Sequence, residues 1–449
     1  MKTRVILVRH GQSTYNQLKR IQGHCDESVL TPQGENQALN VAEALRGIGL
    51  DTIWSSPLKR ARRTAEIISQ SLEITGPQFS DELKEVSLPL WEGMPFQEAE
   101  TLYPEAFDRW RQDPANLVMA VPQAGTDTLV DFYPIRALYD QARRCWQSLL
   151  ERHRGQTLLV VAHSAINRAL IGTAIGLGPE SFHSLQQSNC NISVLNFADG
   201  WQSPVQVEAM NLTSHLGQPL PELRPNHRGP RMLLVRHGET DWNRQGRFQG
   251  QIDVPLNDTG RSQGGKAANF LHPVSLDAAY TSSMARPRET AEIILQHHPH
   301  LNLQALDDLR EISHGEWEGL YTEDIEDGYP GLLQQWQAAP ETVQMPGGEN
   351  LQQVWERSIR AWQHLVATHT HRDKTQTVLV VAHDAVNKAL LCHVLGLGPE
   401  SFWRFKQGNG AVSVIDYPGG SGSTPVLTSA NITTHLSGSV LDKTAAGAL

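Results

Sequence analysis

The sequence predicts two tandem α/β domains of one fold, each with three layers (α/β/α) and a mostly parallel central sheet. Two observations predict this class. The 449-residue chain repeats its own pattern about halfway along, and in each copy short apolar runs alternate with segments of helical periodicity. Strands of a parallel sheet are covered by helices on both faces, so their sequences are apolar without interruption.

The repeat is clearest in LVRHGQSTYN at residues 7–16, which returns as LVRHGETDWN at residues 234–243. The offset between the copies is 227 residues here, and it is 220 residues for the shared segment GLGPESF at 176–182 and 396–402. A register that is kept over this length indicates duplication of a whole domain.

The domain boundaries follow from composition around the repeats. We expect domains over residues 1–217 and 230–437, each long enough for its own core. Residues 218–229 are rich in proline and predict a linker, whereas residues 438–449 are small and polar and predict a disordered tail.

Within the copies, apolar runs predict the strands and periodicity predicts the helices. The first copy has expected strands at 5–8, 52–54 and 158–161, and expected helices at 34–45 and 57–72. The second copy has matching strands at 232–235, 278–280 and 378–381. Residues 192–197 and 205–210, joined through Asp199-Gly200, predict a hairpin that closes the first sheet.

Composition excludes several classes of protein. A net charge of −10 argues against a general nucleic-acid binder. The chain has no apolar run near the ~20 residues of a membrane span and no signal-peptide pattern, so we expect a cytoplasmic protein. The four cysteines form no C-x-x-C pair, which predicts reduced thiols rather than a disulfide framework or a zinc site.

Polar residues follow the predicted strands, and the carboxyl ends of such strands form the ligand-binding edge of an open α/β sheet. The residues expected there are Arg9, His10, Arg60 and His163 in the first copy, and Arg236, His237, Arg286 and His383 in the second. A neutral imidazole can carry a phosphoryl group, and arginine binds phosphate oxygens with a forked set of donors. A second histidine adds a donor, and a further charge if it is protonated. The pattern predicts phosphoryl transfer in each copy.

A departing alkoxide also needs a proton. Each copy offers one carboxyl group for this purpose: Glu85 in LKEVSLPLWEG and Glu311 in LREISHGEWEG. A carboxylic acid in a partly dry pocket can keep its proton near neutral pH. The sequence contains no cluster of carboxylates suited to a metal, so we expect no metal and no cofactor.

These residues resemble the histidine phosphatase superfamily, which includes phosphoglycerate mutases and acid phosphatases, and the resemblance covers both halves. It implies phosphoglycerate mutase-like domains in which His10 and His237 are the phosphorylated nucleophiles. It implies that Glu85 and Glu311 are the proton donors and that the arginines, with His163 and His383, bind the phosphate. The residues it places at the substrate mouth are Asn16, Gln22, Gly23, Asn243, Gln249 and Gly250.

The first half is similar to a narrower group, the plant 2-carboxy-D-arabinitol-1-phosphatase family, whose members are also tandem proteins. The similarity lies in GQSTYN at 11–16, RIQG at 20–23, YPIR at 133–136 and QSNC at 187–190. It implies a sugar-acid phosphate as substrate. In that family the second half has lost catalytic residues, whereas the second copy here keeps all five.

The copies differ before the last parallel strand, where the first has YPIR at 133–136 and the second has PGGENL at 346–351. Arg136 could bind a substrate carboxylate with two hydrogen bonds. The alternative is a surface arginine on a helix.

The sequence therefore predicts a metal-independent phosphatase acting on small sugar or sugar-acid phosphate monoesters. Its expected partner is a small phosphorylated metabolite, with neither nucleic acid nor membrane involved and no particular oligomeric state indicated. Two alternatives stay open: a mutase that retains its phosphoryl group, and one catalytic domain paired with a second domain that senses a phosphorylated metabolite.

Overall fold

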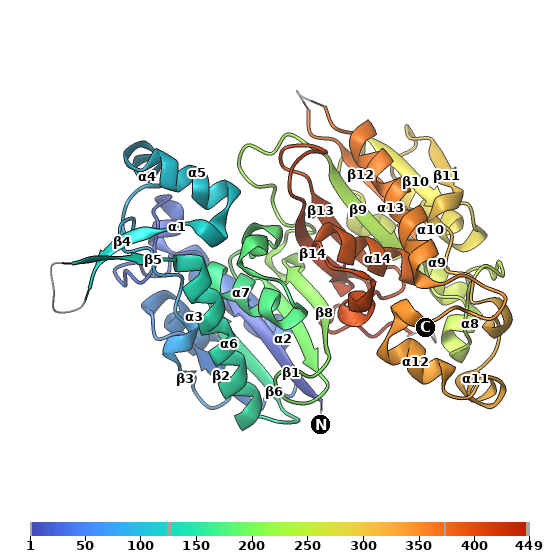
Figure 1. Ribbon diagram of the computed structural model, residues 1–449, viewed down its shortest axis with the longest axis horizontal. Helices are drawn as coiled ribbons and strands as arrows, with labels where there is room; N and C mark the ends of the chain where they lie inside the picture. The colour runs from blue at the N-terminus through green and yellow to red at the C-terminus, as the bar shows by residue number, and fades with distance from the viewer. Residues whose placement is uncertain (1, 124–127, 372–373, 446–449) are drawn as a thin grey trace. The chain divides into compact units, whose positions relative to one another are not determined.

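The computed structural model describes residues 2–123, 128–371 and 374–445. The chain divides into two compact units, one of Met1–Val207 and Asn211–Gln218, the other of Glu208–Met210 and Pro219–Leu449. Both are α/β units with a mixed sheet, and apart from the β4–β5 hairpin of the first unit a similar order of strands and helices recurs in each (Figure 1). Of residues 218–229, expected as a linker, Gln218 belongs to the first unit and residues 219–229 to the second.

The first unit has the strand order β8-β7-β1-β6-β2-β3. The strands are β1 (Thr3–Arg9), β2 (Thr52–Ser55), β3 (Gln78–Phe79), β6 (Thr157–Ala162), β7 (Ile192–Phe197) and β8 (Val205–Leu212). β1, β6, β2 and β3 run parallel, and β7 is antiparallel to β1. The predicted strands and the closing hairpin are thus confirmed. The apolar runs are uninterrupted because both faces are covered: Leu158 to Ala162 are completely buried.

Two pairs of helices cover this sheet. The α-helices of the first unit are α1 (Thr14–Gln17), α2 (Pro32–Leu45), α3 (Lys59–Ser71), α4 (Phe96–Leu102), α5 (Pro104–Gln112), α6 (Pro134–Arg152) and α7 (Ser164–Ile175). α2 packs against α3, and α6 against α7. The chain moves through α2 and α3 toward the β3 edge and returns through α6, so right-handed crossovers place the two pairs on opposite faces. A separate hairpin consists of β4 (Met119–Pro122) and β5 (Leu129–Phe132).

The second unit repeats the arrangement, with the strand order β11-β10-β12-β9-β13-β14. Its strands are β9 (Arg231–Arg236), β10 (Ala278–Ser282), β11 (Leu303–Leu306), β12 (Thr377–Ala382), β13 (Val412–Asp416) and β14 (Val426–Ile432). Its helices are α8 (Asp241–Gln245), α9 (Asp258–Leu271), α10 (Ala285–Leu295), α11 (Thr322–Gly328), α12 (Leu332–Ala338), α13 (Leu351–Thr368), α14 (Asp384–Val394) and α15 (Thr434–Ser437).

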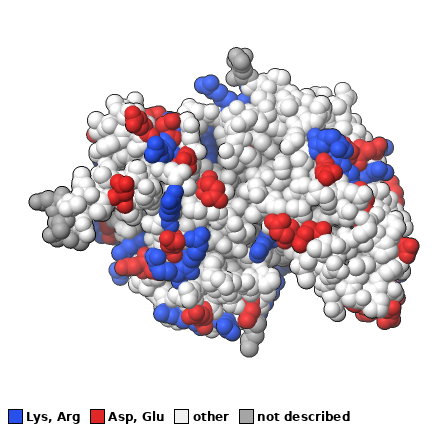
Figure 2. All heavy atoms as spheres, in the orientation of Figure 1, with Lys and Arg blue, Asp and Glu red and all other residues white. Residues whose placement is uncertain are grey.

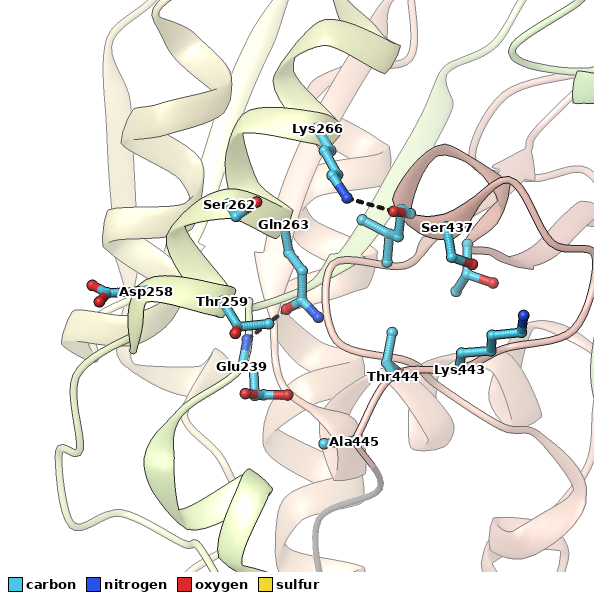
Figure 3. Close-up of a pocket in the computed structure, with 12 residues that line it drawn as sticks. Glu239, Asp258, Thr259, Ser262, Gln263, Lys266, Ser437, Lys443, Thr444 and Ala445 are labelled. Carbon is cyan, nitrogen blue, oxygen red and sulfur yellow. Dashed lines mark hydrogen bonds between the residues drawn. The ribbon is translucent and has the colours of Figure 1, made fainter.

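The C-terminal segment differs from the disorder expected for it. Residues 438–445 are described, and there the Asn409 amide N donates to Thr444 Oγ1 at 3.2 Å while Thr444 N donates to Asp442 Oδ1 at 2.8 Å. Figure 3 shows this segment facing α9 across a pocket of about 420 Å³. Composition alone could not indicate the bond to Asn409, because that partner lies in a loop 35 residues away in the chain. Residues 446–449 lie outside the described residues.

Two further features bear on possible partners. Within the described ranges, no helix combines the length and apolar character needed to cross a membrane. On the face drawn in Figure 2, basic and acidic side chains are interspersed rather than gathered into one area of a single sign.

The four cysteines are all free thiols.

Candidate functional site

In each unit the predicted residues meet at the carboxyl edge of the sheet. Arg9 pairs with Ala162 across β1 and β6, and Ser55 pairs with Val161 across β2 and β6. The next residue on each strand therefore lies at the same edge. As a result the rings of His10 and His163 have their centroids 5.2 Å apart, and the rings of His237 and His383 repeat that distance.

A glycine follows each candidate nucleophile because a helix packs directly against it. A Cβ atom on Gly11 would lie 2.3 Å from Gly34 O in α2, and one on Gly238 would lie 2.4 Å from Gly260 O in α9. Gly11 N also donates to Thr64 Oγ1 of α3 at 3.1 Å. The close contact holds the preceding histidine at a fixed place between the strand and the helices.

The backbone determines the tautomer of both candidate nucleophiles. His10 Nδ1 donates to Gly11 O at 2.7 Å, and His237 Nδ1 donates to Gly238 O at the same distance. A carbonyl oxygen can only accept, so the proton of the neutral ring is on Nδ1 and the lone pair is on Nε2. Burial, followed by the charges of the two neighbouring arginines, holds the pKa of each ring well below its usual range. Each histidine ring is therefore neutral near pH 7, with its lone pair on Nε2.

The arginines of the first site are held by backbone carbonyls. Arg60 is completely buried, and its Nη1 and Nη2 donate to Cys25 O at 3.1 Å and Gly23 O at 2.9 Å. Arg9 Nη1 donates to Gln187 O at 2.8 Å. The Nε atoms of both arginines are buried and have no acceptor among the described residues. Burial lowers the pKa of Arg9 to about 10, which still leaves it charged at neutral pH. These donors suit a phosphate.

The second site repeats this arrangement with one difference at the nucleophile. Arg286 Nη2 donates to Gly250 O at 2.8 Å, and Arg236 Nη1 donates to Gln407 O at 2.6 Å. Arg286 Nε donates to His237 Nε2 at 3.2 Å, which marks that nitrogen as an acceptor. Burial lowers the pKa of Arg286 to about 10.

The second histidine of each site is neutral in the free protein. Burial, followed by the charge of Arg60, holds the pKa of His163 well below its usual range, and the same causes act on His383 through Arg286. His163 Nε2 lies 2.8 Å from Ser56 Oγ, while its buried Nδ1 has no partner among the described residues. We infer that this histidine contributes a hydrogen-bond donor rather than a fixed charge.

Glu85 and Glu311 lie at the N-termini of α7 and α14, immediately beyond His163 and His383. Glu85 accepts three backbone N–H groups, from Val86 at 3.0 Å, Ala165 at 3.0 Å and Ile166 at 3.2 Å. A helix N-terminus favours a carboxylate through its unpaired N–H groups.

Glu311 is in a drier and more acidic environment than Glu85. It is 3% exposed and accepts from Ile312 N at 3.0 Å and Ala385 N at 3.2 Å. Burial raises the pKa of Glu311, and the neighbouring Asp384 carboxylate raises it further. Both effects favour the protonated form of this carboxyl group.

The residues expected at the substrate mouth lie beside the nucleophiles and also support the backbone. Asn16 Oδ1 accepts from Ser13 N at 3.1 Å and from Asn189 Nδ2 at 3.1 Å. Gln22 Oε1 accepts from Ser13 Oγ at 3.1 Å. In the second unit, Asn243 and Gln249 make the same contacts with Asn409 and Thr240, at 3.2 and 2.6 Å. Gly23 and Gly250 offer carbonyls to the arginines described above.

Arg136 is engaged away from these residues. Its Nε donates to Ala115 O at 2.8 Å, Nη2 donates to Asn116 Oδ1, and the guanidinium lies 4.8 Å from the centroid of the Tyr133 ring. These contacts join the start of α6 to the turn before β4. They match the alternative considered for Arg136, an exposed arginine on a helix.

Several supporting residues were given no role from the sequence. Asn189 Nδ2 donates to His10 O at 3.0 Å, and Asn409 Nδ2 donates to His237 O at 3.1 Å. Ser282 Oγ lies 2.9 Å from His383 Nε2, as Ser56 does for His163. The constant offset between the copies was the signal that could have found them, because each keeps its residue type in both halves.

The structure offers no obvious metal centre in the ranges it describes: no three His, Cys, Asp or Glu side chains there are grouped to hold an ion. The charged groups that face the nucleophiles are the arginines.

Comparison with known proteins agrees with this geometry. The profile of the histidine phosphatase superfamily (branch 1) matches residues 5–209 and 232–431. The chain belongs to this superfamily. Both copies are covered, so the resemblance noted from the sequence is confirmed for each half.

Named relatives include proteins that match nearly the whole chain and proteins that match about half of it. The 2-carboxy-D-arabinitol-1-phosphatase of Triticum aestivum is 33% identical over 96% of this chain and 86% of its own length. Phosphoserine phosphatase 1 of Hydrogenobacter thermophilus is 34% identical over 46% of this chain and 94% of its own length. Among solved structures, Bacillus stearothermophilus YhfR is 30% identical with a TM-score of 0.43, covering 46% of this chain and 99% of that protein.

Proposed function

We propose that the protein is a metal-independent phosphatase that hydrolyses small sugar or sugar-acid phosphate monoesters through a phosphohistidine. The substrate class is that of 2-carboxy-D-arabinitol 1-phosphate. The observation that carries the proposal is the neutral histidine of each unit, whose Nδ1 proton is bound by a glycine carbonyl and whose Nε2 faces buried arginines. The similarity to the 2-carboxy-D-arabinitol-1-phosphatase of Triticum aestivum supports the substrate class.

The reaction proceeds in two steps at the first site. His10 Nε2 attacks phosphorus and forms an N–P bond, while the ester O–P bond breaks and its oxygen takes a proton from Glu85. Arg9, Arg60 and the ring of His163 stabilise the charge on the other phosphate oxygens. Glu85 then removes a proton from water, the water oxygen attacks phosphorus, and the N–P bond breaks to release phosphate. His237 and Glu311 act in the same way at the second site.

We propose that both units are catalytic domains, over residues 1–217 and 230–437. Each has its own nucleophile, arginines, second histidine and carboxyl group, which favours two active sites over one active site with a sensor. Because the two differ in the surroundings of the carboxyl group, we expect different rates on a given substrate.

Single-site variants of the full chain test the proposal. Phosphate release is measured from a panel of sugar-acid and sugar phosphates for the wild type, H10A, H237A and the double variant, with and without a chelator. We expect each single variant to lose part of the activity, the double variant to lose nearly all of it, and the chelator to have no effect. Full activity in the double variant would refute a phosphohistidine at these residues. Accumulation of a phosphoryl isomer instead of phosphate, with 3-phosphoglycerate as substrate, would indicate a mutase.

A further inference from the structure

The two sites differ at one buried position behind the phosphate-binding arginine. The first residue of α7 is Ser164, and the corresponding first residue of α14 is Asp384. Asp384 is 2% exposed, and its carboxylate lies 3.3 Å from Arg236 Nη1 and 2.6 Å from Lys388 Nζ. The second site therefore contains a carboxylate that the first site lacks at this position.

Each proton donor consequently faces a different set of charges. In the first unit the cations that act electrostatically with Glu85 include the buried Arg60 and the half-buried Arg9 and Arg168. His24 Nε2 also lies 2.7 Å from the backbone carbonyl of Glu85. Arg168 is the counterpart of Lys388, and no carboxylate lies within 4 Å of Arg9 or Arg168 among the described residues. Cations nearby favour the ionised form of a carboxyl group.

In the second unit, Glu311 faces Arg236 on β9, Arg286 on α10 and Asp384 on α14. Arg357 on α13 donates to the backbone carbonyl of Glu311 at 2.9 Å. Asp384 in turn acts on Glu311 as a like charge. Two cations flank Asp384. Lys388 forms an ion pair with Asp384 within α14, whereas Arg236 pairs with Asp384 and also belongs to the proposed phosphate site.

The buried ring of His314 completes the surroundings of Asp384. His314 is fully buried, stacks on Trp317 and is held neutral by burial, which lowers its pKa to about 3. It adds no positive charge near neutral pH, so it does not offset the like charge that Asp384 presents to Glu311. The corresponding residue of the first copy is Leu88.

We propose that Asp384 is a positioning residue that gives the second site a working range extending to higher pH than that of the first site. The proposal rests on the phosphatase function proposed above. A like charge beside a carboxyl group disfavours loss of its proton. Glu311 can therefore still deliver a proton to the departing ester oxygen, as the O–P bond breaks and the His237 Nε2–P bond forms, at a higher pH than it could without the Asp384 carboxylate. The burial of Glu311 acts in the same direction.

The test measures kcat and KM for phosphate release from glycerol 1-phosphate between pH 5 and 9. H10A reports the second site and H237A reports the first. The substrate ionises identically in both assays, so any difference belongs to the protein. We expect the alkaline limb for H10A to lie on the order of one pH unit above that for H237A, which is about a tenfold difference in relative rate near pH 9. An aryl phosphate serves as a control, because its leaving group needs a proton less and should show a smaller difference.

Exchanging the residues identifies the cause. D384N in the H10A background should move the alkaline limb downward, D384E should restore it, and S164D in the H237A background should move that limb upward. Coincident limbs for H10A and H237A would overturn the proposal. It would also be overturned if D384N lowered kcat by one factor at every pH, as a purely structural residue would. If D384N does not fold, S164D still decides the question, because an unmoved limb there contradicts it. Undiminished activity of the H10A/H237A double variant would instead overturn the phosphohistidine mechanism proposed for His10 and His237.

Discussion

Arg60→Ala is expected to inactivate the first site while leaving the second site intact. The Arg60 guanidinium uses two of its nitrogens to hold the carbonyls of Gly23 and Cys25, which leaves the buried Nε for a phosphate oxygen. Removing one donor that stabilises transition-state charge costs about 2.7–4 kcal/mol. Taking ~3 kcal/mol, kcat/KM should fall by about 150-fold, at ~1.36 kcal/mol for each tenfold change in rate.

The assay is phosphate release in the H237A background, so that only the first site contributes. The substitution also leaves two carbonyls without their donor, at a cost of ~1–3 kcal/mol each, so urea unfolding is measured alongside. Arg60→Lys keeps the charge and loses the forked geometry, and should retain more activity than Arg60→Ala. Arg63→Ala, on the same helix but in an exposed ion pair with Glu35, is the matched control and should change little. A loss below about tenfold for a folded Arg60→Ala protein would refute the role assigned to this arginine.

Three further expectations follow from particular contacts. Gly11→Ala should destabilise the first unit by ~1–3 kcal/mol and inactivate its site, because the new methyl group would lie 2.3 Å from Gly34 O. Gly49→Ala is the control and should fold normally, because a Cβ there meets nothing within 4 Å. Equal urea midpoints for the two variants would contradict this reasoning. Arg136→Ala should change KM equally for carboxylated and neutral phosphates, since its guanidinium contacts Ala115 and Tyr133. A selective rise for carboxylated substrates would show that it binds them. Burial holds the pKa of His163 well below 6.5, so below that pH the unfolded chain binds a proton at His163 that the folded state does not bind. The contribution of the neutral His163 to the stability of the first unit is therefore fully present above about pH 6.5, and the free energy of unfolding falls below that pH by up to ~1.4 kcal/mol per pH unit. His163→Gln should reduce the difference between the urea midpoints measured at pH 7 and pH 5.5.

The elements were largely predictable because their signals are local. The uninterrupted apolar run of β6 and the periodicity of α2 each depend only on neighbours in the chain. The nucleophile and its arginine were predictable for the same reason, since Arg9 and His10 are adjacent in sequence. The C-terminal segment was not, because Thr444 is ordered by a bond to Asn409, and composition carries no information about that partner.

The side-chain roles divide in the same way. The sequence predicted that Glu85 and Glu311 were equivalent proton donors, since each occupies the same motif. The structure distinguishes them through Asp384, which is 73 residues from Glu311 in the chain but acts on it directly in space. Likewise, the sequence left two interpretations of Arg136 open, and its contacts with Ala115 and Tyr133 favour the exposed arginine on a helix.

The sequence by itself determined the duplication, the strand and helix pattern, and the identity of the residues at the carboxyl edge of each sheet. These features depend on the order and spacing of residues along the chain, and the repeated motif allows that order and spacing to be recognised directly. Only the tertiary structure decided the tautomer and neutral state of His10 and His237, the backbone anchoring of the arginines, and the different charges around the two proton donors. Those properties depend on burial and on distances between residues far apart in sequence, because desolvation and Coulomb interactions act through space.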